Sequence, residues 1–71
     1  MRRYSVVLMP EEDGYVAVVP ALPGCVTQGE SATEALEMAR DAIQGMLETL
    51  AARDEEIPEE EGPALLCVLD V

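Results

Sequence analysis

Histidine, lysine, tryptophan and phenylalanine are all absent from this 71-residue sequence. The lack of histidine removes the side chain that most often serves as a general base. The lack of lysine, together with five scattered glycines, leaves no phosphate-binding loop. Two tyrosines are the only aromatic residues, so the chain has no stacking platform for RNA bases. These absences argue against nucleotide-binding proteins, histidine-dependent enzymes and RNA-binding modules.

Positive charge is also scarce, because four arginines face fifteen acidic residues and the formal net charge is −11. A surface of this sign repels phosphate backbones, so we expect no direct binding of nucleic acid. It favours encounter with a basic partner, and acidity that serves solubility alone is an equally good interpretation. The longest uncharged run, residues 14–29, contains two prolines and does not span a bilayer. We therefore expect a cytoplasmic protein without membrane contact.

The two cysteines, Cys25 and Cys67, are expected to be free thiols, because a disulfide between them is disfavoured in the cytosol. A nucleophilic thiol needs a base or a cation beside it, and arginine is the only basic residue type available. We therefore predict no catalytic, cofactor-binding or metal-binding residues. The enzymatic alternative is a nuclease of ribonuclease H type, which needs carboxylates converging on Mg²⁺. The acids here lie mainly in predicted turns, on one helix face and in a connector.

Short β-rich runs occupy the first third of the chain. Residues 4–9 and 15–19 predict two strands of a β-hairpin, joined by a Pro-Glu-Glu-Asp-Gly turn over residues 10–14. The following Pro-Ala-Leu-Pro-Gly stretch contains two residues that cannot donate to a sheet, so it predicts a bend. Residues 25–28 then predict a short third strand that ends at Gly29.

A long helix follows, because Ser31-Ala-Thr-Glu34 has the pattern of a capping box. We expect the Ser31 oxygen to accept an amide of the first turn, and Glu34 to accept the Ser31 amide in return. Apolar residues at three- and four-residue steps predict that the helix runs to about Ala52. The residues expected on its packed face are Leu36, Ala39, Ile43, Met46, Leu47 and Leu50.

Beyond the helix, the acidic stretch 54–62 predicts a solvated connector, and the apolar stretch 64–71 predicts a buried terminal strand. The expected architecture is α+β with the order βββαβ, in which one long helix covers one face of an antiparallel sheet. The strands are apolar at nearly every position, so the second face needs a cover as well. We therefore expect a homodimer or higher homo-oligomer, or another protein bound on that face.

The stretch from Tyr4 to about Leu50 resembles the N-terminal domain of HicB-family antitoxins. It contains the hairpin with an acidic turn ending in glycine, the Pro-x-Leu-Pro-Gly-Cys segment, a short strand closing in glycine, and Thr-x-x-Glu-Ala-like residues at the head of the helix. The residues that carry this pattern are Pro20, Leu22, Pro23, Gly24, Cys25, Gly29, Thr33, Glu34 and Ala35.

The resemblance implies a partial, degenerate ribonuclease H-like fold and a non-enzymatic protein that neutralises a small basic HicA-type mRNA interferase. It implies that residues 1–71 form a single HicB-like antitoxin domain without the C-terminal DNA-binding domain of many family members. The acidic turn residues Glu11, Glu12 and Asp13 are our candidates for contact with the toxin, because they project from the hairpin. The alternative is an orphan homo-oligomeric structural or regulatory module, for which no basic partner is expected.

Overall fold

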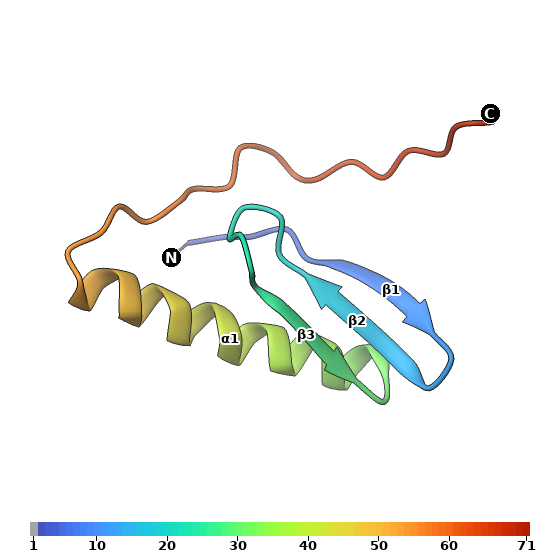
Figure 1. Ribbon diagram of the computed structural model, residues 1–71, viewed down its shortest axis with the longest axis horizontal. Helices are drawn as coiled ribbons and strands as arrows, with labels where there is room; N and C mark the ends of the chain where they lie inside the picture. The colour runs from blue at the N-terminus through green and yellow to red at the C-terminus, as the bar shows by residue number, and fades with distance from the viewer. Residues whose placement is uncertain (1) are drawn as a thin grey trace.

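The computed structural model, which describes residues 2–71, contains a three-stranded antiparallel sheet with one long helix across one face (Figure 1). The strands are β1 (Val7–Glu11), β2 (Gly14–Val18) and β3 (Val26–Gly29), in the spatial order β1-β2-β3. The helix α1 spans Ala32–Ala52. The predicted α+β class is therefore confirmed, as are the first four elements of the predicted order βββαβ.

The hairpin is longer at its tip than predicted. The ladder between β1 and β2 continues through Pro10↔Tyr15 to Glu11↔Gly14, so the turn consists of Glu12 and Asp13 rather than residues 10–14. Proline is tolerated here because β1 is an edge strand, where one side of the backbone has no ladder partner. Gly14 has φ 152°, a conformation that favours glycine. The predicted start at residue 4 was wrong, because β1 begins at Val7, opposite the last residue of β2.

The Pro-Ala-Leu-Pro-Gly-Cys stretch folds back on itself between β2 and β3. The Val19 amide donates to the Cys25 carbonyl at 3.0 Å, and the Cys25 amide donates to the Leu22 carbonyl at 3.0 Å. Gly24 has φ 84°, which a side chain would disfavour. The closed loop buries Val19, Leu22 and Cys25 in one apolar cluster. This stretch is therefore a packed turn, and β3 begins at Val26, one residue later than predicted.

The helix starts where the capping pattern predicts, with one difference in its hydrogen bonds. The Ser31 hydroxyl accepts the Glu34 amide at 3.1 Å, as expected. The Glu34 carboxylate accepts the amide of Glu30 at 3.1 Å, and not that of Ser31 as predicted. At the other end, Asp54 takes φ 55° and the Glu55 amide donates to the Leu50 carbonyl, so the chain leaves the helix after Ala52 as expected.

Small residues bring the helix close to the sheet. Ala35 and Ala39 are buried against Ala17 of β2, and a Cβ on Gly29 would collide with the backbone of Ala35. The predicted packed face was therefore partly wrong: Leu36, placed on it, is 43% exposed because the closest approach lies along the alanines. The side chains that join the second cluster from the helix are Ala42, Ile43 and Met46.

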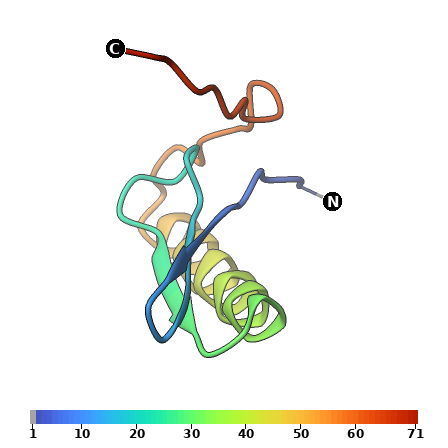
Figure 2. The same cartoon turned by 90° about the vertical axis from the view of Figure 1, so that its right-hand side faces the viewer.

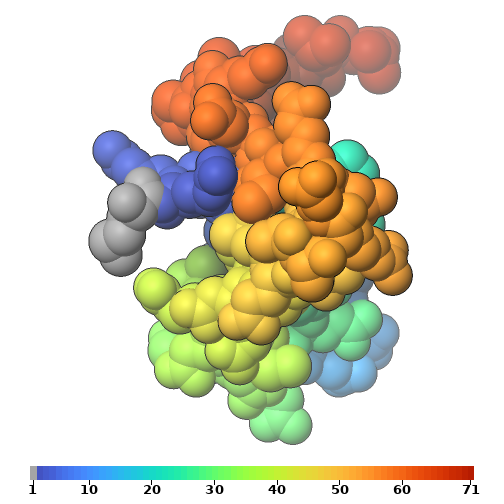
Figure 3. Space-filling view, turned by 90° about the vertical axis from the view of Figure 1, so that its left-hand side faces the viewer, coloured from blue at the N-terminus to red at the C-terminus, as the bar shows by residue number. Residues whose placement is uncertain are grey.

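The predicted terminal strand is not formed. Residues 64–71, which we call the tail, belong to no strand and are exposed, with Leu66 at 88%. Figure 2 shows the tail running away from the N-terminal segment, residues 2–6, and in the space-filling view of Figure 3 the tail stands clear of the body. The connector and the first residue of the tail are bonded to Tyr4 and Ser5, and from there the tail continues without pairing to the free edge of β1.

Candidate partner-binding surface

The sheet has a face that the helix does not cover, which we call the open face. Tyr15 and Ala17 of β2 pack toward the helix together with Leu8 of β1. Because side chains alternate along a strand, the intervening residues point the other way. The register pairs Val7 with Val18, Met9 with Val16 and Val18 with Val26, so these side chains share the opposite face. The apolar residues of the open face are thus Val7, Met9, Val16, Val18 and Val26, and the polar Gln28, paired with Val16, lies on the same face.

This open face is apolar and reaches solvent. Met9 is 44% exposed and Val26 is 54% exposed, whereas the remaining three valines are half-buried by their neighbours. Within residues 2–71 no helix or loop packs over it (Figure 2). A contiguous exposed apolar patch on a small protein is typical of a protein-binding surface. The second face of the sheet is thus uncovered within residues 2–71, and its cover by a partner stays a prediction.

The predicted contact residues Glu11, Glu12 and Asp13 lie together at the tip of the hairpin, and all three are exposed. They border a shallow hollow of about 360 Å³ that is shared with β2 and β3. The hollow also includes Tyr15 and Gln28. The structure thus brings the three carboxylates to one edge of the sheet, as the sequence predicted for a projecting turn.

Two further acidic residues, missed by the sequence reasoning, belong to the same end of the molecule. A Cβ placed on Gly14 would lie 3.1 Å from the Cα of Glu30, so Glu30 lies next to the hairpin tip. Glu34 is tied to Glu30 through the hydrogen bond at the helix start. The register between β2 and β3, which sets Tyr15 opposite Gly29, is what brings them there. We call Glu11, Glu12, Asp13, Glu30 and Glu34 the acidic end.

Cys25 is packed in the core and not presented to a substrate. Its side chain is 3% exposed, and burial raises the pKa of its thiol, which keeps it protonated. Cys67 lies in the exposed tail. Across residues 2–71, no three side chains of the histidine, cysteine or acidic type are grouped to hold a metal ion. In the same range, no helix is long and apolar enough to cross a membrane.

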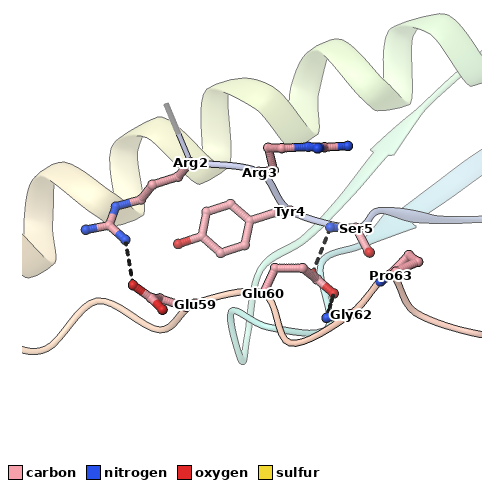
Figure 4. Close-up of a pocket in the computed structure, with 8 residues that line it drawn as sticks. All are labelled: Arg2, Arg3, Tyr4, Ser5, Glu59, Glu60, Gly62 and Pro63. Carbon is pink, nitrogen blue, oxygen red and sulfur yellow. Dashed lines mark hydrogen bonds and ion pairs between the residues drawn. The ribbon is translucent and has the colours of Figure 1, made fainter.

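A second hollow, of about 590 Å³, lies where the N-terminal segment meets the connector (Figure 4). The Tyr4 hydroxyl donates to the Pro58 carbonyl at 2.6 Å, and the Ser5 amide donates to the Glu60 carboxylate at 2.9 Å. The Ala64 amide donates to the Ser5 hydroxyl at 3.0 Å. The hydrogen bond that the Ser5 amide donates lowers the pKa of the Glu60 carboxyl. These bonds, which we call the N-terminal clasp, hold the connector in place.

Comparisons with known proteins find one family model and several relatives. A model of the HicB-like antitoxins of bacterial toxin–antitoxin systems matches residues 4–65. The chain is 47% identical over 57 residues to a UPF0150 protein of Thermoplasma acidophilum, which covers 79% of this chain and 83% of that protein. It is 46% identical over 57 residues to Antitoxin HicB 1 of Photorhabdus laumondii, which covers 79% of this chain and 37% of that protein. It therefore spans well under half of the length of that antitoxin.

Proposed function

The chain belongs to the HicB-like antitoxins of bacterial toxin–antitoxin systems, and from this membership we propose that it neutralises a small basic HicA-type mRNA interferase by direct contact. The antitoxin family indicates a non-enzymatic role. On this proposal the chain works in the cytoplasm, where messenger RNA is translated, and it blocks the toxin's access to RNA without cutting anything itself.

One observation carries the proposal: an apolar face and an acidic end adjoin on the same sheet. The open face can be buried against a partner, which supplies affinity through removal of apolar surface from water. The acidic end continues that surface at the hairpin tip, where Glu12 and Asp13 connect β1 to β2. A basic partner that covers the open face therefore places its cations beside the carboxylates.

Charge and packing are expected to act on different steps of binding. The net charge of −11 attracts a basic protein over a Debye length of about 8 Å at physiological ionic strength, so association slows as salt rises. Dissociation depends on the packed apolar contacts, so its rate changes less with salt. Measured association and dissociation rates at several salt concentrations separate the two contributions.

The decisive experiment is co-expression with the short, basic, histidine-containing product expected from an adjacent reading frame. The proposal predicts that growth is restored and that the two proteins purify as a complex. Toxicity that persists, with no complex formed, would contradict it. Metal-dependent RNA cleavage by the purified chain would instead favour the ribonuclease H-type alternative.

A charge-matched pair of variants locates the contact. Glu11→Gln/Glu12→Gln/Asp13→Asn removes three charges at the acidic end, and Asp54→Asn/Glu55→Gln/Glu56→Gln removes three beyond the C-terminal end of the helix. We expect only the first variant to slow association markedly, about tenfold at low salt, because local charge dominates steering at short range. Equal slowing by both variants would assign the effect to net charge alone, and no slowing would remove the turn from the interface.

A further inference from the structure

A groove that the proposed toxin-binding surface does not include runs between the N-terminal segment and the helix. Its volume is about 490 Å³. We call it the side groove. The apolar side chains that line it are Tyr4, Val6, Leu36, Ile43 and Leu47.

The tail is the other apolar feature without a partner. Leu65, Leu66, Val68 and Leu69 are each more than four-fifths exposed. Fully extended, eight residues span about 26 Å at about 3.3 Å per residue. The stretch of helix that borders the side groove, from Leu36 to Leu47, rises about 17 Å at about 1.5 Å per residue. The tail is therefore long enough to cover the whole groove.

We propose that the tail of one copy lies along the side groove of a second copy, so that two chains exchange their tails in a dimer. A chain's own tail is poorly placed for its own groove. The N-terminal clasp holds the connector at Tyr4 and Ser5, and the N-terminal segment lies between the tail and the helix (Figures 1 and 2). To reach its own groove, the tail must pass around that segment and release the clasp.

Charge also selects this site for contact between two copies. Each chain carries −11, so most surfaces of two copies repel one another. The side groove is bordered by Arg2, whose guanidinium lies 3.9 Å from the Glu59 carboxylate, and by Arg40; these are two of the four arginines. The tail carries a single charge, Asp70. An apolar segment with one carboxylate thus meets an apolar groove with two guanidinium groups, and reciprocal exchange closes the dimer by two-fold symmetry.

The test uses a disulfide between chains, because it distinguishes exchange from docking of the chain's own tail. One protein carries Gln44→Cys, at the wall of the groove, together with Cys67→Ser. The other protein is the unaltered chain, which keeps Cys67. After mixing and mild oxidation, we expect a covalent heterodimer on a non-reducing gel. Asp41→Cys with Cys67→Ser is the matched control, since Asp41 is exposed and does not line the groove.

The single chain with Gln44→Cys and native Cys67 completes the test. Exchange predicts a covalent dimer, whereas a faster-migrating monomer would show that each tail enters its own groove and would overturn the proposal. Equal crosslinking of the Asp41 control would also overturn it, because contact would then be unspecific. No crosslink in any mixture would show that the tail does not occupy the groove.

Sedimentation provides a second measurement that does not depend on the added cysteine. We expect the free chain to sediment as a dimer at micromolar concentration, and Leu66→Asp to raise the dimer dissociation constant at least tenfold. Leu66 is exposed within one chain, so its substitution leaves the fold of that chain intact. Thr33→Asp adds the same charge at an exposed position far from the tail in sequence and is expected to leave the dimer unchanged. A monomeric free chain contradicts the proposal, and because no toxin is present, the outcome does not bear on the proposed antitoxin function.

Discussion

Both faces of the sheet carry apolar side chains, but the helix covers only one of them. The face toward the helix buries Ala17, a small residue, because the helix approaches along Ala35 and Ala39. The open face presents Met9 and Val26, which are larger, and leaves them in contact with solvent. Apolar character alone therefore does not identify the core. The size of the side chains decides how close two backbones come, and this distance decides which face is closed.

The largest difference between the buried cluster and the open face is expected in how much a substitution lowers the free energy of unfolding. Leu22→Ala, in the cluster beside the helix, is expected to lower the free energy of unfolding by about 2–5 kcal/mol, because a fully buried leucine leaves a cavity. Met9→Ala on the open face is its control and is expected to change stability by about 0.5 kcal/mol at most. Urea denaturation monitored by circular dichroism measures both. Equal losses would mean that the open face is covered in solution.

The next difference concerns binding. Val26→Glu on the open face is expected to weaken the complex with the basic toxin at least tenfold, about 1.4 kcal/mol, because it sets a charge in the apolar contact. Met38→Glu is the matched control, since Met38 is 47% exposed but lies on the helix. Calorimetric titration with the toxin gives both affinities. If Met38→Glu weakens binding and Val26→Glu does not, the toxin contacts the helix side of the molecule.

A smaller effect is expected at the start of the helix that closes one face. Ser31→Ala removes the acceptor of the Glu34 amide and is expected to lower the free energy of unfolding by about 0.5–2 kcal/mol. Thr33→Ala, in the first turn, is the control. Denaturation curves that are unchanged for Ser31→Ala would show that the hydroxyl is replaced by water without loss.

The smallest effect is expected in the titration of Glu60 at the N-terminal clasp, which lies outside both faces of the sheet. The pKa of the Glu60 carboxyl is lowered in the folded chain, mainly by the Ser5 amide. A lowered pKa contributes stability at pH values above the unfolded pKa, and this contribution is lost as the pH falls through the folded pKa. A carboxyl NMR titration should therefore show Glu60 ionising at a lower pH in the folded chain than in the urea-unfolded chain. An unchanged Glu60 titration between the folded and unfolded chain would indicate that the clasp is open in solution.

Local signals in the sequence were sufficient for the elements themselves. The Asp-Gly pair at 13–14 predicts a hairpin, and the serine with a glutamate three residues later predicts the helix start at Ser31. The acidic turn was also predictable as an exposed site, because three consecutive carboxylates at a hairpin tip remain in water. Each of these features depends on neighbours within a few residues, so no tertiary contact is needed to recognise it.

Features that depend on distant residues were predicted less well. Leu36 follows the apolar period of the helix, yet it lies beside the side groove because the helix turns its alanines toward the sheet. Glu30 and Glu34 reach the hairpin tip only through the register of β3 against β2. The tail has the composition of a buried strand and starts beside Ser5, near the free edge of β1, yet it forms no ladder with that edge.

The sequence by itself determined the strands, the capped helix, the acidic surface and the lack of histidine-based chemistry, since all of these follow from composition and short-range pattern. Only the tertiary structure decided which apolar residues form the core, which face of the sheet stays open and where the tail goes. For the core and the open face, the physical reason is the close contact of Gly29 with the backbone of Ala35. Two small residues from different elements set the distance between helix and sheet, and no local sequence pattern predicts their contact.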